Sequence, residues 1–185
     1  MNRESRYKSW GPAGGDLLTR DELLAVAWQI SDALTFLSSK NIIHRDVAVR
    51  NVLMGGQKLA KLADFGLCRQ TSLFYTSRGG RLPIKWMAPE SLQTSEFSEK
   101  SDVWSFGVLL FELYTFGDSP FVAVDSNEIF QLATSCCQFD AGQRPHFEQI
   151  RRLLYAALDG QRSHYGYLDV GHAPHHHDLI EETEN

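Results

Sequence analysis

Residues 43–66 read IHRDVAVRNVLMGGQKLAKLADFG, a stretch in which short apolar runs alternate with polar loops. Apolar and β-branched residues at 41–44, 51–54 and 59–63 predict three short strands, and the Gly-Gly pair between the last two predicts a turn. These strands should hold the loop after the first strand beside the loop after the third.

Three oxygen-bearing side chains lie in these two loops. Asp46 is followed five residues later by Asn51, and a second carboxylate, Asp64, comes after the last apolar run. Phosphoryl transfer from a magnesium nucleotide needs one carboxylate that accepts the proton of a hydroxyl, and oxygen ligands for metal ions that bridge the phosphates. The pattern therefore predicts Asp46 as a catalytic carboxylate and Asn51 and Asp64 as magnesium ligands; a capped turn with exposed polar side chains is the alternative.

The strings HRDxxxxN and DFG resemble the catalytic loop and the metal-binding loop of protein kinases. The resemblance continues in the family's order through WMAPE at 86–90, DVWSFGVLLFEL at 102–113 and QRPHF at 143–147, and it covers residues 16–159. It implies ATP and Mg²⁺ as cofactors. It also implies that Leu53 forms the floor beneath the adenine ring, with simple core packing as the alternative.

Within the kinase family, the chain resembles tyrosine kinases of the receptor type. The first signal is that Arg50 stands four residues after Asp46, whereas no lysine stands two residues after Asp46. The second is RLPIKWMAPE at 81–90, which carries the proline and tryptophan that shape a floor for an aromatic substrate side chain. Residues 9–30 resemble the region after the insert of split receptor kinases of the platelet-derived and vascular endothelial growth factor receptor kind. The resemblance implies a catalytic role for Arg50, protein tyrosine substrates, a kinase dimer partner, and a place on the cytoplasmic side of a single-pass plasma-membrane receptor.

The same resemblance implies a mainly α fold: the C-terminal lobe of a kinase, with a few short β-strands around the catalytic loop and no N-lobe. The sequence before Asp46 contains no GxGxxG loop, no VAIK-like lysine and no partner glutamate on a preceding helix. We expect a flexible lead-in at 1–15, a partial kinase domain at 16–159 whose helical region is shortened between 122 and 143, and a disordered tail at 160–185.

A long helix is predicted after Thr19, which forms a capping box with Glu22. One apolar face then recurs at spacings of three and four as far as Lys40. Its members are Leu23, Ala27, Ile30, Leu34 and Leu37. Further helices are expected at 88–93, 102–116, 125–137 and 144–159, the last ending before Gly160, and a mobile loop is expected at 67–83.

The most apolar segment of the chain is 103–116. It is short for a membrane span and contains Ser105, Gly107 and Glu112, so it predicts a buried helix of a soluble domain. The N-terminal residues have no apolar core of the kind that a signal peptide requires, which favours a chain that begins in the cytosol.

Composition excludes some classes of partner. The chain of 185 residues is 43% hydrophobic and carries a formal net charge of −5, so it has the core of a globular domain and no basic excess for nucleic acid or an acidic membrane. Cys68, Cys136 and Cys137 form an odd set without a spaced framework, which predicts free thiols in a reducing compartment.

By resemblance, Arg45 marks kinases that are switched by phosphorylation of the loop after Asp64. Tyr75 is the expected acceptor, because a phosphate carrying about two charges can pair bidentately with a guanidinium; an ordinary exposed tyrosine is the alternative. Phe65 is expected to pack inward, and Gly66 to permit the turn.

Three further residues resemble structural positions of the family. Glu90 and Arg144 should form a buried ion pair that joins the middle of the domain to its last helices. Asp102 should brace the catalytic loop from below through backbone hydrogen bonds, with a simple helix N-cap as the alternative.

The C-terminal tail carries two tyrosines, Tyr165 and Tyr167, in the string SHYGYLDV. They are candidate docking sites for phosphotyrosine-reading adaptor domains, with unmodified tail tyrosines as the alternative. His172 and residues 175–177 raise a metal-binding interpretation, which lacks a carboxylate or cysteine partner at ligand spacing.

Two hypotheses of function follow. The first is a tyrosine kinase with intact catalytic and metal-binding residues. The second is a non-catalytic lobe that binds kinase partners or presents phosphorylated tyrosines. For these 185 residues alone we expect the second, because the Gly-rich loop and the lysine, which are missing here, supply much of the positioning that phosphoryl transfer needs.

Overall fold

Helix α2 (Arg20–Ser39) begins at the predicted capping box. The Thr19 hydroxyl accepts a hydrogen bond from Glu22 N, and the Glu22 carboxylate accepts one from Thr19 N at 2.8 Å. All five residues of the predicted apolar face are buried. The prediction of this helix is confirmed, because the cap and the apolar period specify its start and its buried face.

The computed structural model describes residues 18–71, 75–76, 82–115 and 128–164. The other helices are α3 (Pro89–Thr94), α4 (Glu99–Tyr114), α5 (Glu128–Cys136) and α6 (Phe147–His164). The strands are β1 (Ile42–Ile43), β2 (Val52–Met54), β3 (Ala60–Leu62), β4 (Arg69–Gln70), β5 (Tyr75–Thr76) and β6 (Glu96–Phe97). Short 3₁₀ helices are η1 (Val49–Asn51), η2 (Gly56–Lys58), η3 (Phe65–Leu67), η4 (Ile84–Trp86) and η5 (Ala141–Gln143).

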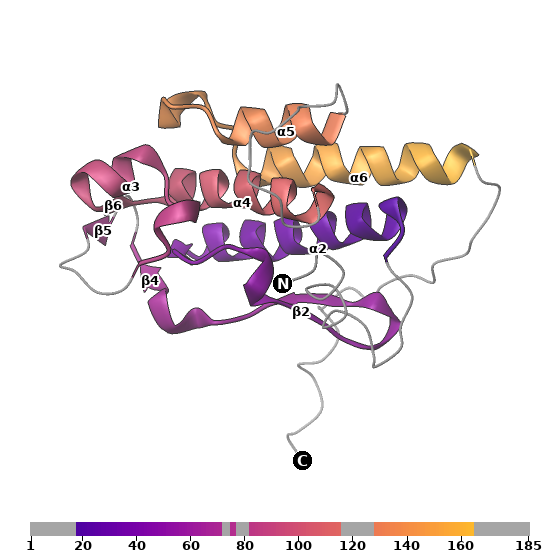
Figure 1. Cartoon of the computed structure of the whole chain (residues 1–185), viewed down its shortest axis with the longest axis horizontal. Coiled ribbons are helices and arrows are strands. Elements are labelled where there is room, and N and C mark those ends of the chain that lie inside the picture. The colour runs from indigo at the N-terminus through magenta and orange to yellow at the C-terminus, as the bar shows by residue number, and fades with distance from the viewer. Residues whose placement is uncertain (1–17, 72–74, 77–81, 116–127, 165–185) are drawn as a thin grey trace, which may run out of the picture.

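Helix α4 is the most deeply buried of the helices described. It packs against α2 and α5, and α6 packs along α2, so the four helices lie as layers with the β2–β3 hairpin against the other side of α2 (Figure 1). Aromatic side chains fill the junction of α4 and α6, where the rings of Phe106 and Phe147 meet edge to face with centroids 6.0 Å apart. No helix in the described part of the chain is long and apolar enough to cross a bilayer.

The strands form three antiparallel pairs. β2 pairs with β3 across the Gly-Gly turn, β1 pairs with β4, and β5 pairs with β6. The three predicted strands are confirmed. Within the mobile loop predicted at 67–83, the structure contains two short strands, β4 and β5, that the sequence analysis did not predict. Both are specified by partners distant in sequence rather than by a local pattern; residues 72–74 and 77–81 lie outside the described residues.

Several predicted helix ends differ from the structure, and α6 begins at Phe147 rather than at 144. Helix α4 starts three residues early, because Ser98 and Ser101 form a capping box. Helix α6 continues through Gly160 to His164, so the expected end, and with it the expected start of a disordered tail at 160, is wrong. Glycine costs about 1 kcal/mol in a helix, which is too little to end one that packs along α2. The first three residues of the helix expected at 125–137 lie outside the described residues.

Gly107 explains how α5 reaches α4 so closely. A Cβ at this position would lie 2.7 Å from Cys137 Sγ, 2.8 Å from Cys136 Cβ and 2.9 Å from Ala133 O. Two of these contacts are with the backbone or the base of a side chain, which cannot move without moving α5. Gly107 therefore sets the distance between the two helices.

Gly107→Ala should destabilise the protein by about 1–3 kcal/mol, because the overpacking of α5 exceeds the gain in helix propensity. Gly160→Ala is the matched control, since a Cβ at that position would have no neighbouring atom within 4 Å; it should stabilise by up to about 1 kcal/mol. Urea unfolding of both variants measures the difference. Equal effects at the two glycines would contradict the packing role of Gly107.

Candidate active site

The predicted catalytic residues occupy one continuous turn. Asp46 lies between β1 and η1, and its carboxylate forms an ion pair with Arg50 one helical turn later. Asn51, at the end of η1, donates from Nδ2 to the backbone oxygen of Asp46 at 2.7 Å. Its own backbone oxygen accepts a hydrogen bond from Ala63 N at 2.8 Å. The structure thus links the Asp46 loop directly to the residue before Asp64.

Asp64 opens the second loop in a left-handed conformation, with φ of 64°. Asp tolerates this region better than most residues, and Asp64 Oδ1 accepts a long hydrogen bond of 3.4 Å from Gly66 N. The Asp64 side chain is exposed. Gly66 therefore takes part in the turn through its backbone, and the carboxylate remains open to solvent.

The oxygen donors of the two loops fit magnesium. Asn51 uses its amide nitrogen within the loop, which leaves Oδ1 as a ligand, and Asp64 adds an exposed carboxylate. Mg²⁺ is typically held by one or two carboxylates together with waters and substrate phosphates rather than by a complete protein cage. Among the described residues no group of three His, Cys, Asp or Glu side chains could form such a cage.

Asp102 holds the backbone just before the predicted catalytic residue, Asp46. Its two carboxylate oxygens accept hydrogen bonds from His44 N at 2.6 Å and from Arg45 N at 2.9 Å. Burial raises the pKa of Asp102 to about 7, while these two N–H donors favour the ionised form. Asp102 lies in the first turn of α4 and does not cap it, because the cap is Ser98.

Two more polar residues of α4 contact the site, and sequence reasoning missed both. Glu112 accepts a hydrogen bond from Val49 N at 3.1 Å, at the start of η1. Ser105 donates to the backbone oxygen of Trp86 at 2.6 Å. The signal that could have found them is the presence of polar side chains in an otherwise apolar, buried helix, where each needs a hydrogen-bond partner.

Arg50 also contacts the segment that resembles a substrate floor. Its Cζ lies 4.1 Å from the centre of the Trp86 ring, in stacking range. Arg50 therefore joins the carboxylate of Asp46 to an aromatic surface, and the neighbouring Ile84 is 67% exposed. Trp86 and Ile84 thus form a partly apolar surface beside Asp46, the predicted catalytic carboxylate.

Arg45 and Tyr75 lie in contact. The Arg45 side chain is buried, and its Cζ lies 4.7 Å from the Tyr75 ring and 4.2 Å from the Phe97 ring. Arg45 Nη1 donates to Leu67 O at 3.1 Å. The predicted acceptor of phosphate is thus held against the predicted phosphate-binding arginine.

Two apolar site residues are more exposed than a core position allows. Leu53, on β2, is 59% exposed, which argues against simple core packing in the described residues. Phe65 is 53% exposed, so the expectation that it packs inward is wrong. Its ring meets His44 edge to face at 5.2 Å, and the described elements place no other layer over it. Leu53 and Phe65 are thus both exposed apolar side chains that are close in sequence to the predicted metal ligands Asn51 and Asp64.

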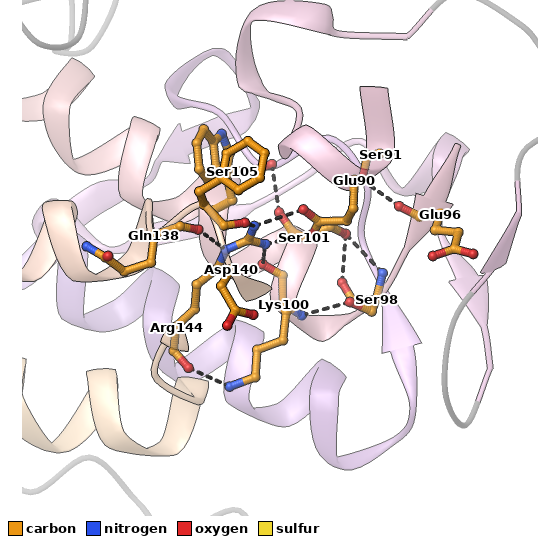
Figure 2. A network of polar contacts seen from close by, with 12 residues as sticks. Glu90, Ser91, Glu96, Ser98, Lys100, Ser101, Ser105, Gln138, Asp140 and Arg144 are labelled. Carbon is orange, nitrogen blue, oxygen red and sulfur yellow. Dashed lines mark hydrogen bonds and ion pairs between the residues drawn. The ribbon is translucent and has the colours of Figure 1, made fainter. Parts of the chain in front are cut away.

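Arg144 and Glu90 form a bidentate ion pair. Arg144 Nη1 and Nη2 donate to the two Glu90 oxygens at 2.7 and 2.8 Å, and Figure 2 shows the guanidinium facing this carboxylate. Nε donates to Gln138 O, while the Nη groups also donate to Lys100 O and Phe139 O. The Arg144 side chain is fully buried, so the network ties α3, α4 and the segment before α6 together.

Comparison with known proteins identifies the family. The model of the family described as protein tyrosine and serine/threonine kinase matches residues 12–135, which include both loops of the site and helix α4. The chain therefore belongs to the protein tyrosine and serine/threonine kinase family.

Several tyrosine kinases are similar to this chain. The tyrosine-protein kinase Abl of Drosophila melanogaster is 42% identical over 164 residues, which is 77% of this chain and 10% of that protein. Fibroblast growth factor receptor homolog 1 of the same organism is 38% identical, over 83% of this chain and 24% of the receptor. Macrophage colony-stimulating factor 1 receptor 1 of Takifugu rubripes is 38% identical, over 76% of this chain and 17% of the receptor. The chain thus spans less than a quarter of the length of these relatives.

Arg144→Lys should destabilise the protein by about 3 kcal/mol or more, because it keeps a buried charge but loses the bidentate geometry and the Nε hydrogen bond. Arg152→Lys is the control, since Arg152 is 75% exposed in its pair with Glu148. Urea unfolding should show a lower midpoint for the first variant and no change for the second. A wild-type midpoint for Arg144→Lys would contradict a structural role of the network.

Proposed function

We propose that this chain carries the catalytic and metal-binding part of a receptor-type tyrosine kinase domain, in the lobe that lies beneath the nucleotide. The reaction is transfer of the terminal phosphate of ATP to a tyrosine hydroxyl of a protein substrate. The observation that carries the proposal is the direct link between the two loops, in which Asn51 bonds to Asp46 on one side and to Ala63 on the other. This link fixes the proton acceptor relative to the metal ligands.

In the proposed reaction, Asp46 accepts a hydrogen bond and then the proton of the substrate hydroxyl. Arg50 holds one oxygen of this carboxylate and leaves the other for the substrate, while its stack on Trp86 aligns both with the floor for an aromatic side chain. Asn51 and Asp64 would hold Mg²⁺, which supplies positive charge to the phosphates when bound. Leu53, exposed on β2, would lie beneath the adenine ring.

Regulation and partners belong to the same proposal. Phosphorylation of Tyr75 would provide an anion for Arg45, and phosphorylated Tyr165 and Tyr167, which lie outside the described residues, would bind adaptor domains. A second kinase molecule would be the dimer partner. The similarity to a fibroblast growth factor receptor homolog and to a macrophage colony-stimulating factor receptor supports a receptor of the plasma membrane with this domain on its cytoplasmic side. The resemblance of residues 9–30 favours the split-kinase receptors.

A non-catalytic interaction module is the second candidate. It is favoured by two exposed apolar side chains, Leu53 and Phe65, which could serve binding without phosphoryl transfer.

The test is incorporation of phosphate into Tyr75 by the purified chain with ATP and Mg²⁺. If these residues suffice for catalysis, the unmodified chain incorporates phosphate, and Asp46→Asn should reduce the rate by about 100-fold or more, because it removes the proton acceptor. Asp159→Asn, an exposed change on α6, is the matched control and should leave the rate unchanged.

Each other outcome has a defined meaning. Equal rates for the wild type and Asp46→Asn would refute the role of Asp46. No incorporation by either would refute catalysis by this chain and favour the interaction module. Titration with Mn²⁺ and ADP, followed by paramagnetic broadening of the Asn51 and Asp64 amide signals, tests the metal ligands without turnover.

A further inference from the structure

The guanidinium of Arg45 lies on an aromatic surface made by two strands. Tyr75 of β5 and Phe97 of β6 are register partners in an antiparallel pair. Register partners direct their side chains to the same face of a sheet, so the two rings form one surface. Arg45 Cζ lies 4.7 Å from the first ring centre and 4.2 Å from the second, so the guanidinium contacts both.

One N–H donor of the Arg45 guanidinium is unused among the described residues. The Arg45 side chain is buried, Nη1 donates to Leu67 O, and Nε has no hydrogen-bond partner within the described part of the chain. A buried donor without a partner is uncommon and points to a missing acceptor. Arg69 adds a second cation, with its Cζ 5.5 Å from the centre of the Tyr75 ring. An anionic group on Tyr75 would meet both charges.

Of the two rings that contact Arg45, the Phe97 ring is the one held in place by burial. It is 2% exposed and packs with Ile43 and Met87. Strand β6 is anchored by Ser91 Oγ, which donates to Glu96 O at 2.6 Å. The next residue, Ser98, caps α4, the helix whose Asp102 holds the Arg45 backbone. Residues at and just before the start of α4 thus position the backbone of Arg45, through Asp102, and its guanidinium, through Phe97.

We propose that Phe97 is a positioning residue, whose ring holds the Arg45 guanidinium by its face so that the N–H groups remain directed at a phosphate on Tyr75. The N–H donors of a guanidinium lie in its plane, so a ring on the face does not compete with bidentate pairing along the edge. The Tyr75 ring can then exchange its contact with the guanidinium for a contact through its phosphate, while Phe97 stays in place. This inference rests on the proposed phosphorylation of Tyr75.

The experiment uses the full chain with phosphotyrosine installed at position 75, and follows the phosphate by ³¹P NMR as a function of pH. In the wild type, the second ionisation of the phosphate should occur at a lower pH than in free phosphotyrosine, because the guanidinium favours the dianion. Phe97→Met, which removes the ring at similar volume, should return the midpoint part of the way, and Arg45→Gln should return it further.

Two controls separate positioning from folding. Phe97→Tyr retains the ring and should keep the wild-type midpoint. Met87→Leu alters the same apolar cluster without a ring contact to Arg45 and should also keep it. Removal of the phosphate by a tyrosine phosphatase provides a second readout, which should be about two to five times faster in Phe97→Met than in the wild type.

The outcomes distinguish the inference from the function on which it rests. A wild-type midpoint for Phe97→Met, together with a changed midpoint for Arg45→Gln, would overturn the role of Phe97 alone. An unchanged midpoint for Arg45→Gln would overturn the pairing of Arg45 with phosphate as well. The wild type alone gives a further test: the ring-current shift of the Arg45 Nε–H signal must persist after phosphorylation, and its loss would overturn the proposal.

Discussion

The contact of Asp102 with the backbone of His44 and Arg45 is the constraint on which the site depends. Two N–H groups of a loop with little regular structure are held by one buried carboxylate of a helix. Arg45 has a positive φ of 70°, a conformation that most residues avoid. The two hydrogen bonds stabilise this turn, and the turn directs Asp46 toward Arg50 and Asn51. Without these hydrogen bonds, Asp102 would not offset the cost of the positive φ at Arg45.

Helix α4 connects this constraint to the rest of the molecule. Its first turn holds the catalytic loop, Ser105 holds the segment at Trp86, and Glu112 holds η1. On another side, Gly107 admits α5, and the Lys100 backbone accepts a hydrogen bond from Arg144. A buried helix that is apolar by composition thus uses a few polar or small residues to position several segments around the site. Sites supported by regular elements hold their geometry more precisely than sites supported by loops alone.

Much of this arrangement could be predicted from the sequence, and the reasons for the failures are physical. Capping boxes and apolar periods specified α2, and short motifs identified Asp46, Asn51 and Asp64 as candidates. The strands β4 and β5 were missed because they depend on partners far along the chain. Phe65 was expected to pack inward by resemblance to the kinase family, whereas its exposure depends on which elements of this chain lie above it. The roles of Ser105 and Glu112 required knowledge of which loop faces α4.

The most direct measurement of the central constraint is native-state hydrogen exchange at the His44 and Arg45 amides, read residue by residue by NMR. If Asp102 fixes the catalytic loop, these two amides exchange as slowly as those in the middle of α4, through global unfolding only. In Asp102→Asn, at least one of them should exchange faster, while the amides of α2 change only as far as global stability changes. Exchange of both amides in the wild type at the rate of exposed loop amides would contradict the constraint.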